Sequence, residues 1–83
     1  MLWSMSARRQ SQAIADELHR AYALWRSESL AVGDAYVRWR DAEERARPSA
    51  FARYTVQLER EAAAAERYQA VIERLGPELR TVA

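Results

Sequence analysis

A heptad pattern in the first half of the chain limits its possible folds more than any other feature. Core-type positions recur at alternating steps of four and three residues, without interruption, at Ile14, Leu18, Ala21, Trp25, Glu28, Val32, Ala35, Trp39, Ala42 and Ala46. This spacing is typical of an α-helix that buries one stripe of side chains against another helix. Acids placed four residues before arginines, such as Asp16 before Arg20, favour a helix over the same residues. We therefore predict a helix over about residues 6–46, about 60 Å long.

Gly33 is the one candidate break in this helix. A helix ending at Val32, with Asp34 capping a following helix, is the alternative interpretation. The stripe keeps its phase across Gly33, which favours one continuous helix.

The stripe does not continue beyond residue 46. The next residues at its seven-residue spacing are charged and cannot form a core: Arg53, Arg60, Arg67 and Arg74. The failure coincides with Pro48, which disfavours helix at the residue before it and suits the first turn of a new helix. A second apolar stripe follows at Phe51, Leu58, Ala65 and Ile72, flanked by Tyr54, Tyr68 and Leu75. Gly76-Pro77 is a stop signal. We predict a turn at about 47–49, a helix over about 50–75 and a short C-terminal tail.

Two striped helices joined by a short link predict a single domain, residues 1–83, folded as an all-α antiparallel two-helix hairpin with a long first and a shorter second helix. A turn centred near 47–48 would set Trp39 level with residues 54–58 and Trp25 level with residues 69–72. The first helix would then overhang the second, leaving Ile14 and Leu18 uncovered.

This overhang, together with a wide apolar arc on the first helix, predicts that the chain does not stay a monomer. We expect a homodimer in which two hairpins form a four-helix bundle of coiled-coil type. The expected interface residues are Trp3, Ile14, Leu18, Tyr22, Trp25, Val32, Tyr36, Trp39, Phe51, Tyr54, Leu58, Tyr68 and Ile72.

Three charged residues near the stripes, Glu28, Glu61 and Arg67, are predicted to set the helix register, with Glu28 pairing with Arg67. Carboxylates inside a four-helix bundle also suggest a metal centre, but such centres use Glu-x-x-His pairs that the chain lacks. The one histidine, His19, lies off the stripe and has no nucleophile in a catalytic arrangement with it. We expect no catalytic residue, metal or cofactor, and no enzymatic activity.

Composition narrows the remaining function classes. The chain of 83 residues has no Cys, two Gly and two Pro, and its thirteen basic and twelve acidic residues nearly cancel. It has neither a secretory signal nor an apolar segment of membrane-spanning length, so we expect a cytoplasmic protein without a membrane partner or small-molecule substrate. The sequence predicts a structural or interaction module that self-associates. The alternatives are an accessory subunit of a larger protein complex, or a small nucleic-acid-associated regulator that uses the Arg-rich surface. The near-neutral charge disfavours nucleic acid as a partner.

Overall fold

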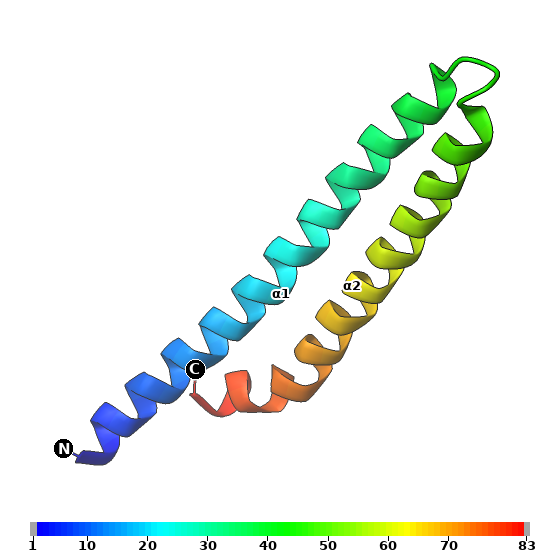
Figure 1. Ribbon diagram of the computed structural model, residues 1–83. Coiled ribbons are helices and arrows are strands. Elements are labelled where there is room, and N and C mark those ends of the chain that lie inside the picture. The colour runs from blue at the N-terminus through cyan, green and yellow to red at the C-terminus, as the bar shows by residue number, and fades with distance from the viewer. Residues whose placement is uncertain (1, 83) are drawn as a thin grey trace.

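Two long helices packed side by side make up the protein (Figure 1). The computed structural model describes the backbone of residues 2–82 and the side chains of residues 6–77. Helix α1 spans Leu2–Arg40 and helix α2 spans Arg47–Val82, and the two run antiparallel. The hairpin is a rod of 66 × 17 × 13 Å. The predicted all-α hairpin is therefore confirmed, whereas the side chain of the predicted interface residue Trp3 lies outside the described residues.

Helix α1 passes through Gly33 without interruption. Gly33 has no positive φ angle, and a Cβ atom added there would meet no neighbouring atom within 4 Å. The continuous helix favoured by the phase of the stripe is present. Neither the backbone conformation nor the surrounding space requires a glycine at position 33.

The connection between the helices lies earlier in the chain than predicted. Helix α1 ends at Arg40, residues 41–46 form the link, and the backbone amide of Ala50 donates to the carbonyl of Ala46 at 3.0 Å to open α2. Pro48 thus lies in the first turn of α2, where its missing N–H group leaves no helical bond unmade. Because Pro48 is already inside α2, residues before it make the reversal, and the predicted helix end at 46 and turn at 47–49 are wrong.

An ion pair marks the end of α1. The guanidinium of Arg40 donates to the Asp41 carboxylate from Nε at 2.9 Å and from Nη2 at 3.1 Å. This hydrogen bond lowers the pKa of Asp41 below its usual value and raises the pKa of Arg40. Arg38 and Arg40 both lie in the last turn of α1, where positive charge interacts favourably with the helix dipole.

The C-terminal part of the second helix also differs from the prediction. Helix α2 continues through Gly76-Pro77 to Val82, with a bend near its end that leads its last turns toward α1 (Figure 1). Gly76 does not adopt the left-handed conformation that would end the helix, and Pro77 removes one backbone donor, which kinks a helix without always terminating it. The predicted end at residue 75 with a short tail is therefore wrong.

At the end of the hairpin away from the link, α2 covers Ile14 and Leu18 of α1. Ile14 and Leu75 are each only 4% exposed and share a cluster with Ala21 and Val71, against which Leu18 packs. The predicted overhang of Ile14 and Leu18 is wrong, because α2 packs against α1 at their level.

The buried side of α2 is displaced by one residue from the predicted stripe. Its less exposed positions recur at steps of four and three, like those of α1, at Ala50, Tyr54, Gln57, Glu61, Ala64, Tyr68, Val71 and Leu75. The predicted stripe of Phe51, Leu58 and Ile72 lies beside it and is exposed. The stripe positions of α1 from Ile14 to Trp39 are all buried or half-buried, as predicted.

Aromatic stacking shows the register of the two helices. Trp39 stacks on Tyr54 with ring centroids 5.3 Å apart, and Trp25 stacks on Tyr68 at 5.6 Å. Trp39 therefore has its predicted level, whereas Trp25 lies opposite Tyr68 rather than residues 69–72. The difference follows from the earlier position of the link.

We predict that Gly33→Ala stabilises the protein by about 1 kcal/mol, because alanine restricts the unfolded chain and fills open space. The midpoint of thermal unfolding, followed by circular dichroism, should rise by about 4–8 °C. The reverse substitution at an exposed position of the same helix, Ala23→Gly, is the matched control and should lower the midpoint by a similar amount. A destabilised Gly33→Ala variant would contradict the open surroundings of this glycine.

Candidate interaction surfaces

Two aromatic clusters join α1 to α2 within one chain. Near the link, Trp39 contacts both Phe51, at 4.9 Å between ring centroids, and Tyr54, and Tyr36 contacts Tyr54 at 5.9 Å. Such ring pairs contribute about 0.5–1.5 kcal/mol beyond the burial of their area. These predicted interface residues thus already contact one another inside the hairpin.

The second aromatic cluster lies two heptads away along the rod. Trp25 and Tyr68 are stacked with an angle of 14° between their ring planes, and Tyr22 meets Tyr68 edge-on at 5.6 Å. The two clusters use equivalent heptad positions, which repeats the same packing along the hairpin.

Half-buried polar side chains lie at the helix interface between the two aromatic clusters. Trp25 Nε1 donates to the Glu61 carboxylate at 2.8 Å, and Ser29 Oγ donates to the same oxygen at 3.4 Å. The Gln57 amide donates to the Glu28 carboxylate and, at 3.4 Å, to the Glu28 carbonyl oxygen. We call Glu28, Ser29, Gln57 and Glu61 the polar layer.

The polar layer corrects one predicted pair and explains the misplaced stripe of α2. Glu28 bonds to Gln57, and no ion pair joins it to Arg67 among the described side chains. Gln57 and Glu61 interrupt the true stripe of α2 with polar residues, whereas the neighbouring stripe from Phe51 to Ile72 is wholly apolar. Both rows alternate by three and four residues when Tyr54, Tyr68 and Leu75 are counted with them, so the spacing alone does not identify the correct stripe.

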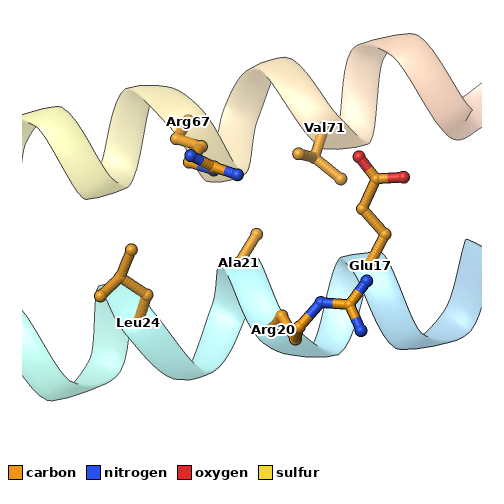
Figure 2. Close-up of a pocket in the computed structure, with 6 residues that line it drawn as sticks. All are labelled: Glu17, Arg20, Ala21, Leu24, Arg67 and Val71. Carbon is orange, nitrogen blue, oxygen red and sulfur yellow. The ribbon is translucent and has the colours of Figure 1, made fainter.

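The two long edges of the hairpin have opposite character. One edge carries Arg53, Arg60, Arg67 and Arg74 of α2, and we call it the Arg edge. Arg74 forms an ion pair with Glu17 of α1 there. A groove on this edge is lined by Glu17, Arg20, Ala21, Leu24, Arg67 and Val71, whose side chains are drawn in Figure 2. Arg67, predicted to set the register, is thus an exposed side chain at this groove.

The other edge is apolar and exposed. It carries the exposed residues Tyr22, Tyr36, Phe51, Leu58 and Ile72 and the half-buried Ala65, and we call this set the apolar face. In the sequence, each of these residues comes one position after a residue of the buried stripe of its own helix. Because the helices run antiparallel, the row on α1 and the row on α2 lie on the same side of the hairpin. The contacts of Tyr22 with Tyr68 and of Phe51 with Trp39 agree with this placement.

Exposure on the apolar face is high for such large side chains. Phe51 is 45% exposed, Leu58 37% and Ile72 39%, and the two tyrosines are similarly accessible. Five of the predicted interface residues thus lie on this face: Tyr22, Tyr36, Phe51, Leu58 and Ile72. Val32, by contrast, is half-buried on the stripe of α1.

The described residues hold no group of three or more His, Cys, Asp or Glu side chains arranged to bind a metal ion. His19 is exposed on α1. Within the same part of the chain, neither helix is long and apolar enough to cross a membrane.

Comparisons with known proteins give no family for this chain. No protein-family model matches it, and no curated protein or solved structure is significantly similar to it.

We predict that Glu61→Met lowers the free energy of unfolding by about 1 kcal/mol, because the half-buried Trp25 indole loses its acceptor. Methionine has nearly the helix propensity of glutamate, so propensity does not account for the loss. Glu61→Gln keeps an acceptor oxygen and should lose much less. Urea unfolding followed by circular dichroism measures both, with Glu59→Met, at an exposed position of α2, as the matched control. Equal losses for Glu61→Met and Glu59→Met would show that the Trp25 bond adds nothing.

Proposed function

We propose that this protein is a non-enzymatic structural module that associates with a second copy of itself. In this proposal the two hairpins pack their apolar faces together and form a four-helix bundle. The observation that carries the proposal is the apolar face, whose large side chains the hairpin leaves exposed to solvent.

The total exposed area supports an association of this size. The chain of 9.6 kDa exposes 6765 Å². A compact monomer of that mass exposes about 5,100 Å², so the hairpin exposes about 1,700 Å² more than expected. A standard protein interface buries about 800 Å² on each partner. The excess is large enough to supply such an interface.

The small core of the isolated hairpin also favours association. The buried apolar side chains of the described residues are Ile14, Ala21, Ala64, Val71 and Leu75, two of which are alanines. None of the described side chains is less than 2% exposed. Domains of this size bury a low fraction of their surface and often depend on oligomerisation for stability. A second copy on the apolar face would add Phe51, Leu58 and Ile72 to the core.

The proposal revises how the predicted interface residues are used. The aromatic stripes, expected to join two copies, are used largely inside each hairpin. The apolar face beside them would join the copies. We propose that the protein is located in the cytoplasm. The absence of Cys and the mixed surface charge are compatible with that location.

We expect the protein to have twice its chain mass of 9.6 kDa in multi-angle light scattering at micromolar concentration. Leu58→Glu and Ile72→Glu should each shift it toward the monomer, because a carboxylate on the apolar face would be buried without a partner. Leu30→Glu and Val56→Glu are matched controls: these side chains are 65% and 54% exposed but lie off the apolar face. Both controls should keep the dimer mass.

A monomer mass for the unmodified chain would overturn self-association. The same result would leave the apolar face free for a different protein and would favour the accessory-subunit alternative. Loss of the dimer in the Leu30 and Val56 variants, with retention in the Leu58 and Ile72 variants, would place the interface elsewhere.

A further inference from the structure

We infer that the outer side of α2 is a second contact surface, on which α2 of another copy of the chain packs in parallel orientation. This surface, which we call the outer face, consists of three neighbouring rows: Arg60 and Arg67, then Val56, Ala63 and Ala70, then Glu59 and Glu66. The outer face is separate from the apolar face, so the inference goes beyond the proposed function and does not depend on it.

The order of the three rows follows from helix spacing and from two surface hollows. Arg53, Val56 and Arg60 lie at the first hollow, and Arg60, Ala63 and Arg67 lie at the second. The apolar row, whose side chains are all exposed, therefore lies beside the arginine row. Each residue of the apolar row also has a glutamate three positions later, a spacing that makes neighbours on a helix surface. A strip of short apolar side chains thus runs along α2 with positive charge on one side and negative charge on the other.

The charges of the outer face have no partners within their own chain. Arg60, Arg67, Glu59 and Glu66 are exposed, and none of them forms an ion pair or a hydrogen bond with another described side chain. None of them has an opposite charge three or four residues away on α2 either. The pairs that usually stabilise a charged helix surface are missing here, which leaves these four charges available to another chain.

Opposite charge on the two sides of one strip makes the outer face complementary to itself in a single orientation. About a two-fold axis along the helices, two parallel copies of α2 bring the arginine row of each against the glutamate row of the other. Arg60 then lies about 1.5 Å in height from Glu59 of the second copy, and Arg67 is equally close in height to Glu66. Each pair occurs twice. In an antiparallel pair equivalent rows meet, which sets like charge against like charge and disfavours that orientation.

The size of the side chains between the charged rows sets the closeness of this contact, and its charges set the strength. Ala63 and Ala70 present only methyl groups, so the helix axes can approach to about 8 Å, the lower end of the range for packed helices. Exposed ion pairs are individually weak, so we expect the contact at about millimolar rather than micromolar concentration. The mass at micromolar concentration therefore depends on the apolar face alone. At higher concentration the outer faces join dimers into larger assemblies.

Disulfide cross-linking tests the parallel orientation. The chain has no Cys, so Val56→Cys and Ala70→Cys each introduce one thiol on the apolar row. In a parallel pair every residue of this row lies opposite itself, within the roughly 7 Å between Cα atoms that a disulfide can bridge. Mild oxidation at about 1 mM protein should convert most of either variant to a linked dimer. In an antiparallel pair equivalent residues meet only at the axis, so at most one of the two variants would be linked. Ala23→Cys, at an exposed position of α1, is the matched control and should stay unlinked.

Charge reversal tests the pairing of the two rows. In the Ala70→Cys background, Arg60→Glu with Arg67→Glu makes both rows acidic, and Glu59→Arg with Glu66→Arg makes both rows basic. Each double change should lower the yield of linked dimer about fivefold, because like charges then meet. An equal mixture of the two variants should restore the yield, because each acidic row then meets a basic one. About 300 mM salt should also lower the yield of the Ala70→Cys variant, since screening weakens exposed ion pairs.

A control with the same change in net charge separates a specific contact from a general charge effect. Arg8→Glu with Arg9→Glu alters exposed side chains of α1 and should leave the yield unchanged.

The outcomes separate this inference from the proposed function. Linking of both cysteine variants, with recovery in the mixture of charge variants, supports the inference. Linking of only one cysteine variant overturns the parallel orientation, and a mixture as weak as its components overturns the charge pairing. Linking of neither variant overturns the contact and leaves the outer face to a different protein. A monomer mass at micromolar concentration overturns the apolar-face dimer, whereas the cross-linking result at millimolar concentration still decides this inference.

Discussion

Antiparallel packing of two offset heptad stripes is the constraint on which the rest of the structure depends. The stacks of Trp25 on Tyr68 and of Trp39 on Tyr54 lie fourteen residues apart on both helices, so one register satisfies both. That register also brings Glu61 to the Trp25 indole and Gln57 to Glu28, and it pairs Arg74 with Glu17. A shift by one heptad position would separate the stacked rings and leave the polar layer without its partners, which is why the layer helps to specify a single alignment.

The same packing makes the two edges of the hairpin unlike. In each helix the stripe is flanked by two rows, and antiparallel packing brings like rows together on each side. One side gathers the four arginines of α2 with Glu17 and Leu24 of α1, and the other gathers tyrosines, Phe51, Leu58 and Ile72. The rod therefore has one charged and one apolar edge, and the apolar edge gives the proposed association its direction. In this proposal, self-association follows from the apolar side chains that the hairpin itself leaves exposed.

Much of the fold follows from the sequence, and the misplaced parts have identifiable physical causes. The phase from Ile14 to Trp39 is enough to define the buried side of α1, and the failure of that phase near Pro48 is enough to require a second helix. The predicted end of α1 is too late because the spacing of the stripe continues through Ala42 and Ala46, which lie in the link. The predicted end of α2 is too early because Gly76-Pro77 resembles a stop signal. In the structure, the missing backbone N–H group of Pro77 bends α2 near this point and does not end it.

The sequence by itself determined two amphipathic helices, a reversal between them and an excess of apolar surface, because all three depend on local spacing. Only the tertiary structure decided which stripe of α2 is buried. Hydrophobicity favours the row from Phe51 to Ile72. The row that faces α1 instead contains Gln57 and Glu61, which are stable at this half-buried interface because Glu28, Ser29 and Trp25 of α1 bond to them. The bonding partners of these half-buried polar groups lie 29 to 36 residues away in the sequence, and folding brings them within bonding distance. The same displacement moves the most apolar row of α2 from the core to the surface.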